Sequence, residues 1–147
     1  MPFRDSRAVN VHNESEESED IRRMAVADTT EIQGLLSALN GKHGILGCLL
    51  VSPEGGVVSS SLPPDIDVGT LGALSATLFS NNDVSLQRMN RGTLTQMTLL
   101  TDQGILHFYQ VSNHFLVVLT AKGQRINLEG LIRSVEEQSA SLAKVLA

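Results

Sequence analysis

Aromatic residues and cysteine are scarce in the sequence. It contains no Trp and only 3% aromatic residues, so aliphatic side chains must fill the core. Its single cysteine, Cys48, excludes an internal disulfide and favours a reducing, cytoplasmic location. No apolar run approaches the roughly 20 residues that span a bilayer, and the polar, acidic N-terminus does not read as a secretory signal.

Motifs for catalysis, phosphate binding and metal binding are also missing. The sequence has no P-loop, no strand–GxGxxG–helix unit and no GxSxG elbow. The four histidines (His12, His43, His107 and His114) fit no zinc spacing, and one cysteine cannot complete such a site. We therefore expect no catalytic residue, no cofactor and no metal. The histidines are interpreted as structural or solvated, and Cys48 as a small buried hydrophobic residue.

Charge is unevenly distributed along the chain. Residues 1–31 hold eight acids and four bases, a net charge of -4, whereas residues 32–147 hold eight acids and seven bases, a net charge of -1. The second part is nearly neutral and lacks the basic stripe that nucleic acid or anionic lipid would require. Neither is expected as a partner, and no membrane insertion is expected.

The composition divides the chain into two parts. Residues 1–27 are predicted to be a disordered acidic tail, because residues 10–20 include one apolar residue and five acids. This tail could be a linker, an interaction segment or simply a solvated end. Residues 28–147 have the size and apolar content of a single domain.

Hydrophobic periodicity and turn residues predict three helices and five strands in the domain. The first helix should begin near Asp28–Thr30, with Thr30 and Gln33 as a capping box. The other elements follow in the order strand, strand, helix, three strands and helix, at residues 45–52, 57–62, 67–82, 93–101, 105–111, 115–120 and from 127.

Strand polarity predicts the order of the sheet. The first and fifth strands are apolar throughout, so they should be central neighbours, and the more polar second and third strands should be edges. Hairpin connections then give an α+β fold with a mainly antiparallel sheet in the order 2-1-5-4-3, although the direction of the central pair stays open. Residues 93–101 contain no charge or Pro that would block an open edge, so pairing with another chain is predicted there.

The middle helix carries an unusual set of small residues, Gly69, Gly72, Ala73 and Ala76, beside its leucine stripe. Each interior glycine costs a helix roughly 1 kcal/mol relative to Ala, so close approach of another backbone is the expected compensation. The approaching backbone could equally be this protein's own sheet or a partner helix.

Three segments carry a resemblance to a known family. They are GILGCLLVSPEGGVVSSS, IDVGTLGALSATLF and LTQMTLLTDQGILHFYQVSNHFLVVLTAKGQRINLEGLIRSVEE. From about residue 30 to residue 147, the chain resembles the roadblock family of dynein light chain-like and GTPase-regulator modules. The resemblance implies that the first and last helices cover one face of the sheet and the middle helix covers the other.

The resemblance also implies an interface. Family members typically dimerise through the middle helix and the third strand, which here gives the interface residues Gly69, Gly72, Ala73, Ala76, Thr95, Met97 and Leu99. Bacterial and archaeal members often partner a Ras-like small GTPase, and the gliding-motility members activate it by remodelling it rather than by inserting an arginine. Arg88 and Arg91 could stabilise phosphoryl-transfer charge, but a solvated loop is the favoured interpretation.

The sequence therefore predicts a non-enzymatic, cytoplasmic homodimer that binds a small Ras-like GTPase and modulates its nucleotide cycle, as a GTPase activator or a passive binder. The alternative is a scaffold or adaptor subunit that pairs with another roadblock-like chain or a motor complex. A small-molecule sensor is less favoured, because an aliphatic core with few aromatics does not suggest a roomy polar pocket.

Overall fold

The computed structural model describes residues 29–123 and 125–146, and the acidic tail predicted over residues 1–27 lies outside them. Residues 29–37 are helical and lead to a short 3-10 helix, η1 (Lys42–Gly44). A hairpin of β1 (Ile45–Val51) and β2 (Val57–Ser61) follows, and then the long helix α2 (Val68–Arg88). The chain continues through β3 (Gln96–Thr101), β4 (Gly104–Val111) and β5 (His114–Thr120), and then α3 (Leu128–Leu146).

The five strands form one sheet in the order β2-β1-β5-β4-β3, which confirms the predicted order. Every neighbouring pair is antiparallel, including β1 and β5, the pair whose direction the sequence left open. Six of the seven residues of β1 are buried, whereas β3 has no buried residue. The apolar strands therefore occupy the centre, and the more polar strands form the edges.

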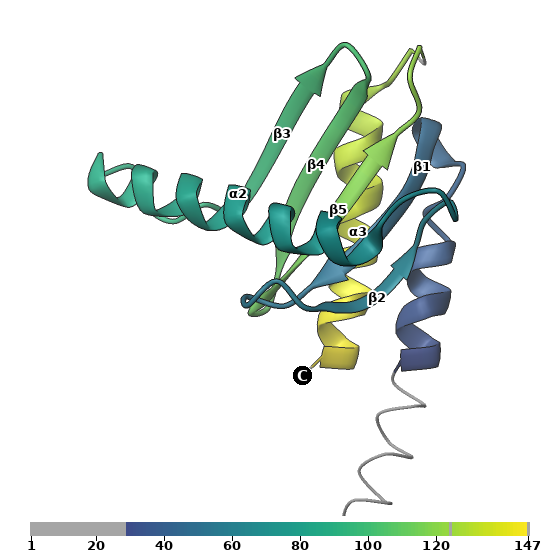
Figure 1. Cartoon of the computed structure of the whole chain (residues 1–147), viewed down its shortest axis with the longest axis horizontal. Coiled ribbons are helices and arrows are strands. Elements are labelled where there is room, and N and C mark those ends of the chain that lie inside the picture. Colours follow the sequence, from purple (N-terminus) through teal and green to yellow (C-terminus); the bar gives the residue numbers. More distant parts are fainter. Residues whose placement is uncertain (1–28, 124, 147) are drawn as a thin grey trace, which may run out of the picture.

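Helices cover both faces of the sheet, as predicted. The helix at residues 29–37 and α3 lie on one face, and α2 crosses the other (Figure 1). The start of α2 is fixed by Asp67, whose carboxylate accepts hydrogen bonds from the Thr70 hydroxyl at 2.8 Å and the Thr70 backbone N–H at 3.3 Å. The hydroxyl bond and the backbone bond lower the pKa of Asp67.

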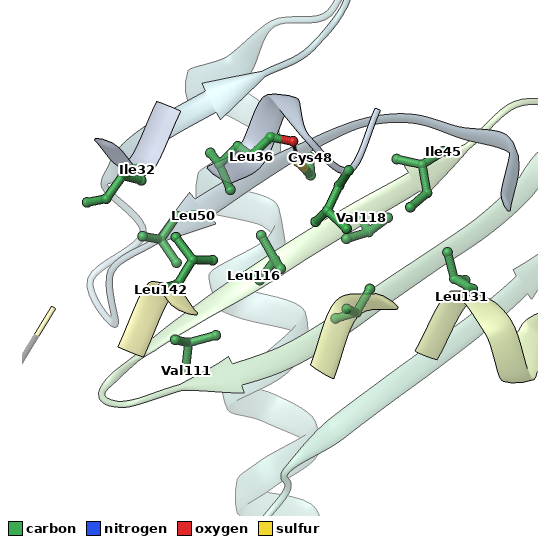
Figure 2. Close-up of a cluster of buried hydrophobic side chains, with 12 residues drawn as sticks. Ile32, Leu36, Ile45, Cys48, Leu50, Val111, Leu116, Val118, Leu131 and Leu142 are labelled. Atoms are coloured by element: carbon green, nitrogen blue, oxygen red, sulfur yellow. Dashed lines mark hydrogen bonds between the residues drawn. The ribbon is translucent and has the colours of Figure 1, made fainter. Parts of the chain in front are cut away.

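The core is accordingly split into two clusters by the sheet. Figure 2 shows the cluster on the two-helix face, where Leu36 of the first helix and Leu131 and Leu142 of α3 meet Leu50 and Leu116 of the central strands. The cluster on the α2 face is smaller and contains the aromatic residues Phe79, Phe108 and Phe115. The rings of Phe79 and Phe115 stack with centroids 5.1 Å apart.

The end of α2 differs from the prediction. The helix was expected to end near residues 80–82, but it continues to Arg88. The amide of Asn82 bonds to the Leu78 carbonyl at 2.7 Å, so a polar residue of the expected stop is accommodated within the helix. Beyond the C-cap residue Met89, Asn90 has φ 58°, and a bond from the Arg91 N–H to the Leu86 carbonyl completes a Schellman motif.

Two smaller predictions also need correction. Thr30 lies within the helical residues 29–37, so it does not occupy the N-cap position of the predicted capping box. Instead, the Gln33 side chain accepts a hydrogen bond from the Ser59 hydroxyl at 2.8 Å and so ties the first helix to β2. The third strand begins at Gln96 rather than at residue 93, because the Leu94 N–H bonds to the Asp83 carboxylate instead of a strand.

Candidate interaction surface

The outer edge of β3 is open in the described chain. β3 pairs with β4 on one side and ends the sheet on the other. Its six residues, Gln96–Thr101, include no charged side chain and no Pro. Leu100 is 70% exposed at this edge. An uncharged edge with an exposed leucine has backbone groups available for pairing with a further strand.

The outer surface of α2 is unexpectedly apolar. Leu74 is 58% exposed, and Leu78, Val84 and Met89 are also exposed. The buried residues of the helix are instead Gly72, Ser75, Ala76 and Phe79, so residues 80–88 include none. The leucine stripe read from the sequence therefore points partly to solvent, while mostly small side chains face the sheet.

These two features lie next to each other. In Figure 1 the C-terminal part of α2 extends past β3, beyond the edge of the sheet. Near the C-terminal end of this helix, Val84 is 48% exposed and Met89 is 60% exposed. We call the outer edge of β3, together with the exposed apolar side chains of α2 and of its C-cap residue (Leu74, Leu78, Val84 and Met89), the edge surface.

The structure divides the small-residue set of α2 into two groups. Gly72 and Ala76 are buried, and a Cβ added to Gly72 would lie 2.5 Å from Cγ2 of Val57 and 3.1 Å from the Gly55 carbonyl oxygen. The approaching backbone at these positions is therefore the β1–β2 hairpin of the same chain, one of the two alternatives that the sequence left open. Gly69 and Ala73 are exposed, so they are accessible to a partner.

The predicted residues of the third strand are also divided. Thr95 is exposed but precedes β3, and its carbonyl accepts a hydrogen bond from the Gln110 N–H. Met97 and Leu99 are half-buried against the α2-side cluster. Because side chains alternate along a strand, Leu100 lies on the opposite face, where sequence reasoning did not single it out. The consecutive leucines at positions 99 and 100 interrupt the alternation, and this was the sequence feature that could have identified Leu100.

Groups that could carry chemistry are dispersed in the described residues. Within residues 29–123 and 125–146, no cluster of three or more His, Cys, Asp or Glu side chains could hold a metal ion. Cys48 is fully buried and donates to the Leu36 carbonyl with an Sγ···O distance of 3.2 Å. Burial raises the pKa of its thiol to about 12, so the reactive thiolate is disfavoured.

His107 is the most perturbed histidine of the described chain. It is fully buried on β4, and its Nδ1 lies 2.7 Å from Oγ1 of Thr98 on the edge strand, whereas its Nε2 has no hydrogen-bond partner. Burial lowers the pKa of His107 to about 4, so the imidazole is neutral near pH 7. Its position inside the sheet fits a structural role, as the sequence predicted.

His43, Arg88 and Arg91 are exposed, whereas His114, the first residue of β5, is half-buried. His43 lies in η1 with φ 50°, and its Nε2 is 3.1 Å from Oγ of Ser134 on α3. Arg88 is the last residue of α2, and Arg91 follows in the connection to β3, both with exposed side chains. Arg88 was expected in a loop, and its position in the helix follows from the longer α2.

None of the helices in the described ranges combines the length and the apolarity that crossing a membrane requires. Comparison with known proteins then places the chain in a family. Residues 31–121 match the model of the Roadblock/LC7 domain. The uncharacterized protein MJ0310 of Methanocaldococcus jannaschii is 30% identical over 115 residues, which cover 78% of this chain and 98% of that relative.

Solved structures with the same fold include two bacterial proteins. Myxococcus xanthus MglB aligns with a TM-score of 0.74 and 19% identity, over 80% of this chain and 95% of MglB. The gliding protein MglB of Thermus thermophilus aligns with a TM-score of 0.70 and 14% identity, over 81% of this chain and 90% of that protein. With the sheet order, the helix placement and the family match in agreement, the chain belongs to the Roadblock/LC7 domain family.

Proposed function

We propose that this protein is a non-enzymatic homodimeric regulator that binds a small Ras-like GTPase and modulates its nucleotide cycle. The observation that carries the proposal is the edge surface, where an uncharged open strand lies beside an overhanging apolar helix. Pairing of two such edges would satisfy the free backbone groups of β3 and remove the exposed side chains of α2 from water. A second copy of this chain, related by a twofold axis, would supply both gains at once.

The exposed apolar side chains favour association. Fully burying a leucine or methionine side chain is worth roughly 1.5–3 kcal/mol relative to leaving it exposed. Leu74, Met89 and Leu100 are each more than half exposed. Burial of these three in each protomer would offset a substantial part of the 4–15 kcal/mol or so that association costs in lost translational and rotational freedom.

We infer the GTPase partner from the family resemblance and from the likeness to the gliding proteins. The exposed surface of α2 adds one feature that such a partner could use. Gly69 and Ala73 are exposed small residues on α2, so a partner backbone can approach the helix closely at these positions. The described residues offer no assembled catalytic group, so we propose that any effect on GTP hydrolysis arises from rearranging the GTPase's own residues. A cytoplasmic location is part of the same proposal.

The test is a binding measurement with purified Ras-like GTPases of the source organism, each loaded with GDP or with a non-hydrolysable GTP analogue. We expect binding of the GTP-analogue form to be at least about tenfold tighter, a difference of about 1.4 kcal/mol. Equal affinity for the two forms, or no binding to either, would contradict a role in the nucleotide cycle. Formation of a mixed dimer with a second roadblock chain would instead support the scaffold alternative.

A matched pair of variants connects the function to the surface. Ala73→Arg places a long charged side chain on the exposed face of α2 and should weaken GTPase binding or dimerisation. Ala140→Arg introduces the same side chain at an exposed position of α3 and should leave both unchanged. Equal effects of the two substitutions would mean that net charge, rather than the α2 surface, controls binding.

A further inference from the structure

Exposed basic side chains gather at one end of the domain. They come from two segments that are far apart in the sequence, η1 and the connection between β5 and α3, and they are Lys42, His43, Lys122 and Arg125. We call this group the basic end. Lys42, Lys122 and Arg125 are three of the seven Lys and Arg residues in residues 32–147.

Backbone and side-chain contacts hold the two segments together. The Ala121 N–H bonds to the Gly44 carbonyl at 3.0 Å, and the antiparallel pairing of β1 with β5 aligns Ile45 with Thr120. A Cβ added to Gly130, in the first turn of α3, would lie 2.7 Å from Cε1 of His43. In Figure 1 both segments lie at the end of the molecule from which α3 starts.

Acidic side chains only partly offset these charges. Glu129 in the first turn of α3 is paired with Arg133, with an N···O distance of 3.4 Å. Asp102 lies in the turn between β3 and β4, and this turn is near the end of β5, because a Cβ added to Gly104 would lie 2.7 Å from the Thr120 carbonyl oxygen. The N-terminus of α3 adds the positive end of a helix dipole. The basic end therefore has an excess of positive charge within a domain that is nearly neutral.

The acidic run of the same chain has complementary charge. Residues 14–20 contain five acids in seven positions and no base. Eight residues, 21–28, separate this run from the described helix, and when extended they span about 26 Å. The helix at residues 29–37 rises about 12 Å at 1.5 Å per residue, and the four turn residues 38–41 add at most about 13 Å. The tether of eight residues is therefore long enough for the acidic run to reach the basic end.

We propose that residues 14–20 dock on the basic end of their own chain. The contact is electrostatic and reversible, and it covers Lys42, Lys122 and Arg125 until a stronger anionic group displaces it. Tethering supplies a high local concentration, so weak pairs between exposed charges suffice to populate the docked form. The acidic tail would then control access to a surface on the opposite side of the molecule from the β1–β2 turn.

Paramagnetic relaxation enhancement tests this directly. A nitroxide is attached at position 17 through Glu17→Cys, while the fully buried Cys48 stays unlabelled. The isotope-labelled chain is diluted into an excess of unlabelled protein, so that only contacts within one chain are detected. We expect selective loss of the amide signals of Lys42 and Lys122, with those of the β1–β2 turn at Glu54 and Gly55 retained. Uniform loss, or no loss, would overturn the proposal.

Two triple variants that remove the same charge provide the control. The basic-end variant replaces Lys42, Lys122 and Arg125 with Gln, and the control variant replaces Arg88, Arg91 and Lys144 with Gln. The signal loss should disappear in the basic-end variant and persist in the control variant. Equal behaviour of the two variants would overturn the proposal.

A salt titration of the spin-labelled protein, with its basic residues unchanged, tests whether the contact is electrostatic. At about 0.5 M NaCl the Debye length is about 4 Å, and the selective signal loss should vanish. Persistence of the loss at this salt concentration would mean that the tail is held by something other than charge.

Discussion

Acidification should destabilise the fold through His107, a neutral imidazole buried within the sheet. An unfolded chain has a histidine pKa of about 6.5, whereas burial lowers the pKa of His107 to about 4 in the folded protein. Between these values, the unfolded state binds a proton that the folded state does not. Stability contributed by the neutral side chain is therefore complete above about pH 6.5 and is lost as the pH falls toward 4.

The magnitude follows from the width of that window. A difference of about 2.5 pKa units, at 1.36 kcal/mol per unit, corresponds to roughly 3 kcal/mol once the pH is below both values. Between about pH 7.5 and pH 5, the expected loss from this one residue is about 2 kcal/mol. That is a considerable share of the 5–15 kcal/mol or so by which a domain is stable.

The assay is urea unfolding at these two pH values and at one fixed protein concentration, for the natural chain and for His107→Gln. Glutamine keeps a polar side chain at the position but does not titrate, so other ionisable groups cancel in the difference between the two proteins. The loss of unfolding free energy between the two pH values should be about 2 kcal/mol smaller in the variant. An identical loss in both proteins would refute the burial of a neutral imidazole at this position.

Further predictions concern the helix surface, the arginines and the thiol. Gly72→Val should lower stability by about 1–3 kcal/mol in urea unfolding, because its side chain would overlap β2; an unchanged midpoint would contradict this packing. Ala73→Arg should leave the circular dichroism spectrum and melting temperature near their natural values while weakening association in light scattering. Joint replacement of Arg88 and Arg91 with Ala should change any stimulation of GTP hydrolysis by less than about threefold, whereas loss of an arginine finger would cost about a thousandfold. Cys48 should react with a thiol reagent only after the protein is unfolded, and rapid reaction of the folded protein would contradict its burial.

Strand order could be predicted because burial has a direct signature in composition. A strand covered on both faces must be apolar on both. The apolar composition of residues 45–51 and 115–120 therefore predicted that these strands are central. The direction of their pairing has no such signature, since either direction buries the same side chains. The structure shows that this pair is antiparallel.

The orientation of α2 was harder to predict, because packing distance rather than hydrophobicity determines its buried face. The hairpin comes so close that Gly72 has no room for a Cβ, and Ala76 is buried beside it. The larger Leu74 and Leu78 are therefore displaced toward the outside. A periodicity argument assigns the largest apolar side chains to the core and so cannot anticipate this exchange.

The edge surface could be predicted only in part for a related reason. The absence of charge and Pro in β3 is visible in the sequence, but the overhang of α2 depends on where the helix ends. Asn and Ser residues near position 80 favour a stop in isolation, yet their side chains can bond within a helix. The exposure of Val84 and Met89 follows from this longer helix.

Light scattering coupled to size exclusion measures whether the protein is a homodimer. We expect a mass close to twice the 15.8 kDa of the chain for the full protein, and a similarly doubled mass for a truncation that lacks residues 1–27. Leu100→Lys, which places a charge on the β3 edge, should lower the mass. A monomeric mass for the full protein across the accessible concentration range would contradict the homodimer.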